Sequence, residues 1–204
     1  METVLETKNI TMKFGGLVAV DNFSMKLGKS DLVGIIGPNG AGKTTIFNMI
    51  TGIYKPTEGD ILLANENIVG KHVALITQKG IARTFQNIRL FKDLTVLDNI
   101  RIAGHYRTDY GLMANILRTK KFHQEEKRLK AEAIELLKIF KLDGKLNHLA
   151  KNLPYGEQRR LEIARALATK PDVLLLDEPA AGMNPNETAD LTKLIRWVRD
   201  EFKI

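Results

Sequence analysis

Residues 37 to 45 read Gly37-Pro38-Asn39-Gly40-Ala41-Gly42-Lys43-Thr44-Thr45 and match the pattern G-x-x-x-x-G-K-[ST]. The apolar run 32–36 before this stretch is suited to a buried parallel strand, and the apolar residues that follow the stretch have helical spacing. Gly40 and Gly42 let the backbone curl so that successive N–H groups point at a phosphate, and a helix N-terminus adds partial positive charge. The sequence therefore predicts a phosphate-binding loop between a strand and a helix.

Two side chains complete this predicted phosphate site. Lys43 supplies a full positive charge at the β- and γ-phosphates, and the Thr44 hydroxyl is suited to ligate the Mg²⁺ that accompanies a nucleoside triphosphate. All of residues 37–45 are candidate nucleotide-binding residues. The alternative is a glycine-rich turn without a ligand, which the flanking strand-like and helix-like runs disfavour.

A second informative stretch is Val173-Leu174-Leu175-Leu176-Asp177-Glu178, an apolar run followed by two carboxylates. This pattern predicts a buried strand that delivers two acids to its C-terminal edge, where ligands bind in open α/β sheets. Asp177 is suited to hold the Mg²⁺ shell, and Glu178 to orient or deprotonate an attacking water. The alternative is a strand that merely ends in a solvated acidic turn.

Between these two stretches, residues 153–167 read LPYGEQRRLEIARAL. Here the chain resembles the ATP-binding-cassette ATPases, whose signature LSGGQ shortly precedes the acidic strand, and Gly156 lies 21 residues before Asp177. The resemblance implies ATP as the nucleotide, contacted across a dimer by Tyr155, Gly156 and Glu157. Pro154 stands where the family usually has Ser, so the γ-phosphate contact would depend on backbone N–H groups at the start of a helix. An ordinary amphipathic helix after a proline turn is predicted as well.

The same resemblance assigns roles outside these motifs. Phe14 resembles the aromatic residue that stacks on adenine, with a core phenylalanine as the alternative. Gln86 resembles the glutamine that touches Mg²⁺ and the attacking water while sensing a membrane partner. Beside it, four apolar residues form what we call the 85–91 patch: Phe85, Ile88, Leu90 and Phe91. This patch is suited to receive a helix of that partner, and the alternative is that it fills a seam of the core. Residues 179–185 resemble the loop that crosses to a second subunit, with Asn184 where Asp is more usual.

A histidine that the family uses at the γ-phosphate has no counterpart here. It is expected about 30 residues past the acidic pair, whereas the sequence ends at Ile204, 26 residues past Glu178. The four histidines all precede Asp177 and are interpreted as surface or local packing residues: His72, His105, His123 and His148. We therefore expect a fragment without the last strand or strands, which binds ATP better than it hydrolyses it.

Composition is consistent with one domain in a reducing compartment. The 204 residues are 44% hydrophobic and 27% charged, enough for a single core. No run approaches the roughly 18 apolar residues of a membrane span, and the N-terminus lacks the features of a signal peptide. The absence of cysteine excludes disulfides, thiolate zinc sites and cysteine nucleophiles. The net charge is +7, and the basic residues are densest at 118–121 and 127–130. The favoured interpretation of these segments is a solvated helix face, followed by a surface attracted to anionic lipid and then by a nucleic-acid-binding surface.

Patterning along the chain indicates its organisation. Residues 1–36 have the alternation of antiparallel strands, and a turn at 56–60 precedes a short strand at 61–63. Thr95-x-x-Asp98 resembles a capping box that opens a helix. A second helix has an apolar stripe, which consists of Leu129, Ala133, Leu136, Leu137 and Phe140. We predict one domain over 1–204, with a nucleotide-binding core of 1–94 and 166–204 and a helical subdomain of about 95–165.

The predicted fold is an α/β P-loop NTPase of the ATP-binding-cassette type, with a mixed central sheet, an N-terminal antiparallel β-subdomain and an inserted helical subdomain. The resemblance implies an ATPase with Glu178 and Gln86 in catalysis and Thr44, Gln86 and Asp177 around Mg²⁺. It further implies a partner cassette, identical or different, transmembrane permease subunits and indirectly a solute-binding protein, with the chain cytoplasmic on the inner face of the membrane. Branched-chain amino-acid import is the expected role. Urea uptake, lipopolysaccharide export, a soluble cassette ATPase and a non-hydrolysing nucleotide-binding module are the alternatives.

Overall fold

The computed structural model describes residues 2–105 and 120–204 and divides into two compact units. The first, here the sheet unit, comprises Met1–Arg83, Pro171–Asp177 and Thr188–Ile204. The second, here the helical unit, comprises Thr84–Lys170 and Glu178–Glu187.

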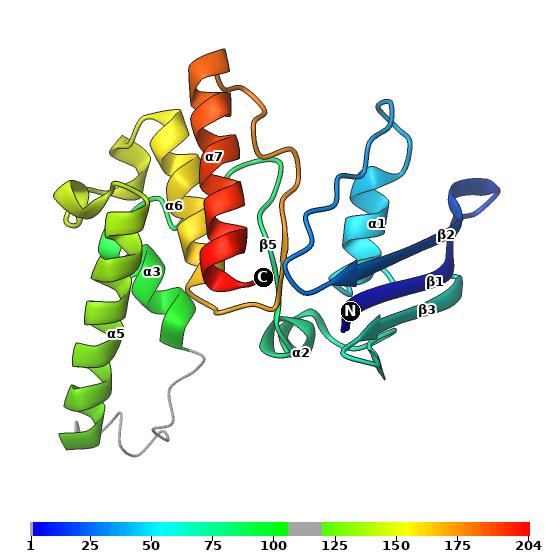
Figure 1. The fold of residues 1–204 in the computed structure, drawn as a ribbon, viewed down its shortest axis with the longest axis horizontal. Helices are drawn as coiled ribbons and strands as arrows, with labels where there is room; N and C mark the ends of the chain where they lie inside the picture. Colours follow the sequence, from blue (N-terminus) through cyan, green and yellow to red (C-terminus); the bar gives the residue numbers. More distant parts are fainter. Residues whose placement is uncertain (1, 106–119) are drawn as a thin grey trace. The chain divides into compact units, whose positions relative to one another are not determined.

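The sheet unit contains a four-stranded antiparallel sheet of order β2-β1-β3-β4 (Figure 1). Its strands are β1 Thr3–Phe14, β2 Leu17–Gly28, β3 Glu58–Leu63 and β4 Glu66–Asn67. Gly15, with φ of 57°, makes the tight turn of the β1–β2 hairpin. The antiparallel strands that the sequence predicts in 1–36 are thereby confirmed up to Gly28, and the strand predicted at 61–63 is confirmed within β3.

Two further strands of this unit, β5 Ile81–Arg83 and β6 Val173–Leu175, pair in parallel. The strand predicted at 173–176 is confirmed as β6, and Arg83 is in register with Leu175. The helices of the unit are α1 Lys43–Ile50, α2 Val73–Gln78 and most of α7 Pro185–Phe202. His72 caps α2, because its Nδ1 accepts a hydrogen bond from the Ala74 N–H, as local packing predicts.

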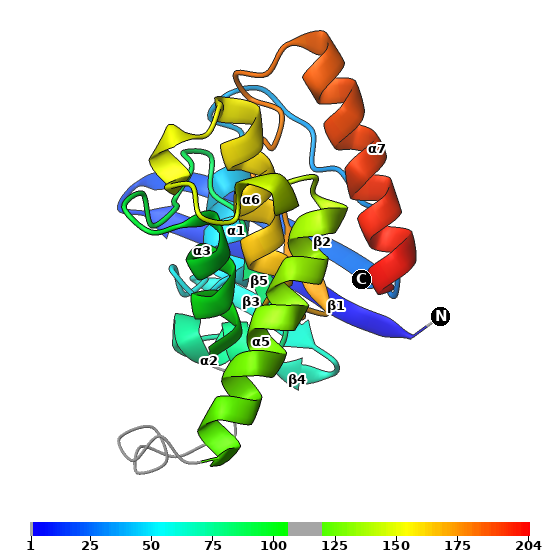
Figure 2. The same ribbon diagram turned by 90° about the vertical axis from the view of Figure 1, so that its left-hand side faces the viewer.

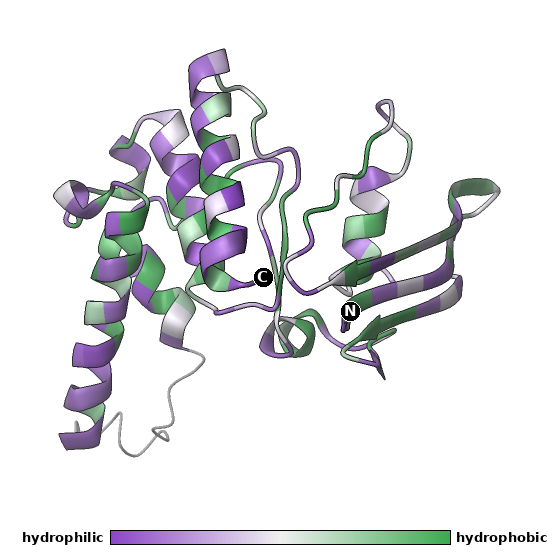
Figure 3. Cartoon of the chain, in the orientation of Figure 1, coloured by the Kyte–Doolittle hydropathy of each residue, from purple (hydrophilic) through white to green (hydrophobic). Residues whose placement is uncertain are grey.

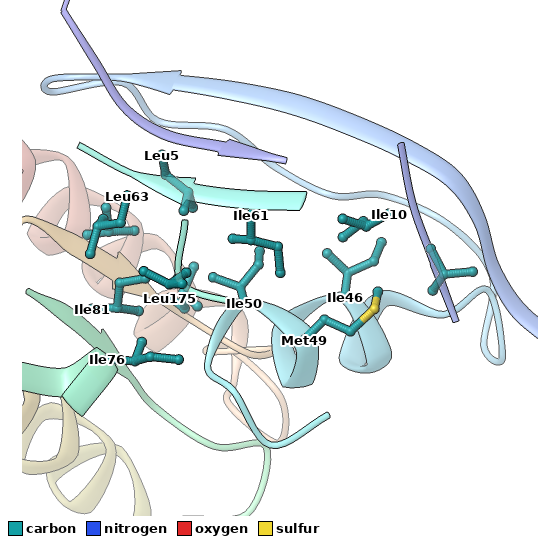
Figure 4. Close-up of a cluster of buried hydrophobic side chains, with 13 residues drawn as sticks. Leu5, Ile10, Ile46, Met49, Ile50, Ile61, Leu63, Ile76, Ile81 and Leu175 are labelled. Carbon is teal, nitrogen blue, oxygen red and sulfur yellow. The ribbon is translucent and has the colours of Figure 1, made fainter. Parts of the chain in front are cut away.

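A buried apolar cluster holds the sheet unit together (Figure 4). Ile46, Met49 and Ile50 of α1 are at most 4% exposed and pack with Ile10 and Ile61 of the antiparallel sheet. Fully burying each such side chain contributes about 1.5–3 kcal/mol. The helical spacing predicted after the phosphate-binding loop is therefore correct, and it fixes α1 against the sheet.

The strand predicted at 32–36 is wrong in this structure. Residues 32–36 have no regular secondary structure, and Val33 and Ile36 are 49% and 97% exposed. A strand is stabilised by hydrogen bonds to a neighbouring strand, and this run pairs with none of the described strands, including β5 and β6. Its apolar composition alone therefore does not make it extended and buried.

The helical unit contains α3 Val96–Gly104, α5 Lys120–Ile139 and α6 Tyr155–Leu167, with short 3-10 turns η2 Asp143–Lys145 and η3 Ala150–Asn152 (Figure 2). The predicted capping box opens α3, since Thr95 Oγ1 accepts from the Asp98 N–H at 3.0 Å and donates to Asp98 Oδ2 at 2.7 Å. The predicted stripe of α5 is confirmed by buried Leu129, Ala133 and Leu137, opposite a hydrophilic face (Figure 3).

Charged side chains of α5 behave as a solvated face. Lys127, Arg128 and Lys130 are exposed, and Arg128 pairs on the helix surface with Glu125 and Glu132. The basic stretch 118–121 lies only partly within the described residues. None of the described helices is long and apolar enough to cross a membrane.

Candidate functional site

The phosphate-binding loop has the backbone that its glycines predict. Gly40 and Gly42 have φ of 84° and 82°, and Gly42 is the N-cap of α1 without a side-chain hydrogen bond to the helix. The amides of the first turn of α1 therefore remain available to an anion. A Cβ atom at Gly42 would lie 2.4 Å from the Ala19 carbonyl oxygen, so packing also requires glycine there.

Lys43 folds back over this loop. Its Nζ donates to the carbonyl oxygens of Gly37 at 2.7 Å and Pro38 at 2.9 Å. A phosphate oxygen is a stronger, charged acceptor than a carbonyl, so a bound nucleotide would compete for this amine. Thr44 follows on the first turn with an exposed side chain. The loop thus offers amides, a cation and a hydroxyl, the groups that a nucleotide with Mg²⁺ requires.

Asp177 is buried in the sheet unit and paired with Arg83. The residue is 5% exposed, and its Oδ2 accepts from Arg83 Nη2 at 2.8 Å. The same guanidinium donates from Nη1 to Asn48 Oδ1 at 2.7 Å, and Asn48 lies on α1. Arg83 therefore links the acidic strand end to the helix of the phosphate-binding loop. The sequence analysis did not assign this role to Arg83. The available signal was that two apolar, strand-like runs end in opposite charges, one in Arg83 and the other in Asp177, and these runs pair in parallel.

In the helical unit, the two predicted catalytic residues meet. Gln86 Nε2 donates to Glu178 Oε2 at 2.9 Å, and both side chains are exposed, so water can reach the carboxylate. Glu178 has φ of 45°, the left-handed region, which costs a non-glycine residue about 1–2 kcal/mol. Such strain persists only where surrounding contacts hold it.

The signature segment opens α6 in the same unit. Tyr155 is 44% exposed, and its Oη donates to the Ala181 carbonyl at 3.0 Å. The Glu157 carboxylate pairs with Lys145 at 2.6 Å. A Cβ at Gly156 would lie 3.0 Å from the Glu187 carboxylate, so a larger residue would require the Glu187 side chain to shift slightly.

Asn184 has a structural role that the sequence analysis missed. Its Oδ1 accepts from the Glu187 N–H at 2.9 Å, and Glu187 Oε2 accepts from the Asn184 N–H at 3.0 Å. This reciprocal pair caps α7, and Pro185 follows at the first helical position. The spacing Asn-x-x-Glu was the available signal.

Phe14 lies at the end of β1 and is 41% exposed. Its ring contacts Tyr54 edge to face, with centroids 5.4 Å apart. The alternative of a core phenylalanine is therefore wrong. An exposed aromatic face suits stacking on a base, which remains a prediction.

The predicted site residues thus form two groups. Residues 37–45, Phe14 and Asp177 belong to the sheet unit, with Asp177 joined to α1 through Arg83. Gln86, Glu178 and the segment 155–157 belong to the helical unit. Among the described residues, no three His, Cys, Asp or Glu side chains gather as a metal site. A Mg²⁺ that arrives with ATP does not need one, because phosphates and water supply most of its ligands.

Comparison with known proteins agrees with these motifs. The family model for the ABC transporter matches residues 20–181. The chain belongs to the ABC transporter family. This ABC ATPase is 44% identical over 199 residues to the high-affinity branched-chain amino acid transport ATP-binding protein LivG of Escherichia coli, covering 98% of this chain and 78% of LivG. It is 45% identical over 201 residues to BraF of Pseudomonas aeruginosa, covering 98% of this chain and 79% of BraF.

Solved structures of the family have the same fold. The ADP conformation of the ATP-binding cassette MJ1267 gives a TM-score of 0.83 at 33% identity, covering 98% of this chain and 78% of that one. The dimeric cassette MJ0796, bound to ADP and Pi, gives 0.79 at 26% identity, covering 98% and 84%. The P-loop NTPase fold of the cassette type is thereby confirmed, and the chain is an ATPase subunit of an ABC transporter.

Proposed function

We propose that this ABC ATPase hydrolyses Mg-ATP to drive uptake of leucine, isoleucine and valine. The observation that supports this solute class is the 44–45% identity to LivG and BraF over 98% of the chain. The resemblance of Tyr-Gly-Glu-Gln-Arg-Arg at 155–160 to that subfamily points the same way. Urea uptake and lipopolysaccharide export are weaker alternatives.

In the proposed binding mode, the amides at the start of α1 and Lys43 hold the phosphates of ATP, and Phe14 stacks on adenine. Mg²⁺ would be held by the Thr44 hydroxyl, with Asp177 and Gln86 around its shell, and would neutralise charge that develops on the phosphates. The left-handed glycines of the loop and its uncapped helix support this assignment, since both present N–H groups to an anion.

For hydrolysis, Glu178 is the group that orients or deprotonates the attacking water, and Gln86 fixes the orientation of that carboxylate. The hydrogen bond of 2.9 Å between Gln86 and Glu178 is the observation that supports these roles. Gln86 keeps its amide oxygen for a further partner, because only its Nε2 is used in this bond.

The proposed partners follow from the dimeric cassette among the structural relatives. Two cassettes would close face to face, each presenting Tyr155, Gly156 and Glu157 to ATP held by the other. The 85–91 patch would receive a permease helix, and Phe91 at 47% exposure is its most accessible member. The chain would thus work peripherally on the cytoplasmic face of the membrane, with a solute-binding protein supplying the permease.

Uptake measurements test this proposal. Cells that lack the gene should lose uptake of labelled leucine, isoleucine and valine, and should regain it with the wild-type gene but not with Glu178→Gln. Unchanged uptake in the deletion strain, together with ATP hydrolysis by the purified protein, would contradict branched-chain amino-acid uptake and favour one of the other solutes.

A further inference from the structure

Arg159 is a fully buried cation in the helical unit. It lies on α6, within the segment that begins at Tyr155, and its side chain is 0% exposed. Its guanidinium makes five hydrogen bonds, to the carbonyl oxygens of Phe85 at 2.6 Å, Gln86 at 3.3 Å, Glu178 at 3.0 Å and Pro179 at 3.0 Å, and to Glu162 Oε2 at 2.7 Å. Four of these acceptors are backbone atoms of two separate loops.

Glu162 lies one turn further along α6 and binds one of these loops as a hydrogen-bond acceptor, whereas Arg159 binds it as a donor. Its carboxylate is 2% exposed, and its Oε1 accepts from the Arg89 N–H at 3.0 Å and the Phe85 N–H at 3.5 Å. Arg159 and Glu162 together therefore bind both the N–H and the C=O groups of the turn that carries Gln86.

One atom of Arg159 connects the two residues of the proposed water-activating pair. Nη2 donates to the carbonyl of Gln86 and to the carbonyl of Glu178, while the side chains of these two residues bond to each other. Glu178 is the residue with φ of 45°, a conformation that needs outside support. At its own carbonyl this support comes from Arg159 and from the Ala181 N–H, which donates at 3.1 Å.

A purely stabilising role explains this arrangement poorly. A buried ion pair is often no more stabilising than apolar side chains of the same volume, so stability alone does not require Arg159 and Glu162. The planar guanidinium has five donors in fixed directions, which suits four carbonyls on two loops. A lysine has three donors on one atom and cannot reproduce that geometry.

We propose that Arg159, braced by Glu162, is a positioning residue that sets the Glu178 carboxylate against Gln86 by holding the backbones of both loops. This inference rests on the proposed roles of Glu178 and Gln86. It assigns to α6 a task within its own subunit, separate from the role of residues 155–157 toward ATP of a partner.

Steady-state kinetics of Arg159→Lys test the proposal in the complete protein. We expect kcat to fall between about 10-fold and about 100-fold, since displacement of a catalytic group by about 1 Å costs rate on that scale. KM for ATP should change less than twofold. Rates are normalised to bound nucleotide, so that loss of folded protein does not count as loss of turnover. Arg128→Lys, the same exchange on the exposed face of α5, is the matched control and should leave both constants unchanged.

A second variant keeps the test decisive if Arg159→Lys folds poorly. Arg159→Met combined with Glu162→Leu removes both buried charges together, so that neither is left unpaired, and should lose turnover to the same extent. Amide hydrogen exchange adds a measurement that does not depend on catalytic activity. Amides of 85–89 and 178–181 should exchange faster together in both Arg159 variants, and should stay protected in Glu178→Gln and Arg128→Lys.

The outcomes separate this inference from the proposed function. Normal kcat per bound nucleotide in the Arg159 variants, with turnover abolished in Glu178→Gln, would overturn the positioning role alone. Full turnover in Glu178→Gln would overturn the proposed catalytic pair, and coupled exchange of the two loops would then decide whether Arg159 clamps them.

Discussion

At the scale of the residue, Glu178 is the proposed catalytic group, and its backbone is also in a strained conformation. Its exposed carboxylate bonds to Gln86, while its main chain is left-handed and held by Arg159. The side chain and the backbone can therefore be changed separately: a substitution at 178 alters the acid, and one at 159 alters its placement.

Glu178→Gln should lower kcat by about 10²-fold to 10⁴-fold, the usual contribution of a general base, without weakening ATP binding. The amide keeps the size of the carboxylate and one acceptor oxygen, but it cannot take a proton from water. A nucleotide-bound dimer should accumulate and be visible by size-exclusion chromatography with Mg-ATP. Wild-type turnover in this variant would remove Glu178 from the reaction.

A second residue, Glu66, determines part of the response to acid. Lys79 at 2.5 Å and Lys71 at 2.9 Å lower the pKa of its carboxyl from the usual 4.5, the Lys79 hydrogen bond being the larger cause. Because the folded pKa is the lower one, the ion pairs contribute stability above pH 4.5 that is lost as the pH falls through the folded pKa.

Glu66→Gln should therefore lower the urea midpoint at about pH 7, and this difference should be smaller at about pH 3, because below the usual pKa of 4.5 protonation removes the charge that the ion pairs need. Urea titrations of both proteins at the two pH values measure it. The effect at pH 7 will be small, because solvent screens ion pairs that are exposed. A difference that is equal at both pH values would mean that the charge of Glu66 is not its cause.

At the scale of the element, the sequence predicted structure wherever local pattern was sufficient. The turn between β1 and β2 and the start of α3 at Thr95 depend on neighbours within a few residues, and the stripe of α5 depends on spacing within one helix. The strand prediction at 32–36 was wrong because a strand needs a hydrogen-bonded partner strand, which the residues of the run do not specify. Arg83 and Arg159 were missed for a related reason, since Arg83 bonds to a residue 94 positions away and Arg159 to one 74 positions away.

The 85–91 patch is the element proposed to meet the permease. Phe91 is exposed and lies under the Arg165 guanidinium at 5.3 Å, whereas Leu90 is half-buried. Changing Leu90 and Phe91 to Ser should leave ATP binding intact but lower leucine uptake about tenfold or more, the effect of losing an anchor that contributes about 1.4 kcal/mol to the interface.

Leucine uptake and nucleotide binding of the double variant are measured beside Ile102→Ser, which removes an apolar side chain that is 43% exposed on α3. The control should transport normally. Unfolding of the double variant would make the patch part of the core, and normal transport would put the permease contact elsewhere.

At the scale of the whole molecule, nucleotide should stabilise the folded chain by mass action. ATP at about 100 times its dissociation constant adds about 2.7 kcal/mol to the free energy of unfolding, if only the folded state binds it. Lys43→Ala should abolish this gain, because the phosphates lose a side-chain cation that the loop provides. Thermal melts with and without Mg-ATP measure both, with exposed Lys29→Ala as a control that keeps the shift. An equal shift in Lys43→Ala would contradict the binding mode.

The close approach of Gly42 to the Ala19 carbonyl has an evolutionary consequence. At 2.4 Å from that oxygen, a Cβ would disturb the sheet whether or not the protein ever meets a nucleotide. Gly40 shares the left-handed backbone, but a Cβ there would meet nothing within 4 Å. In descendant proteins that have lost ATP binding, Lys43 and Gly40 should therefore be substituted first, while Gly42 should be retained. A surviving glycine at 42 would then record the ancestry of the fold rather than an active enzyme.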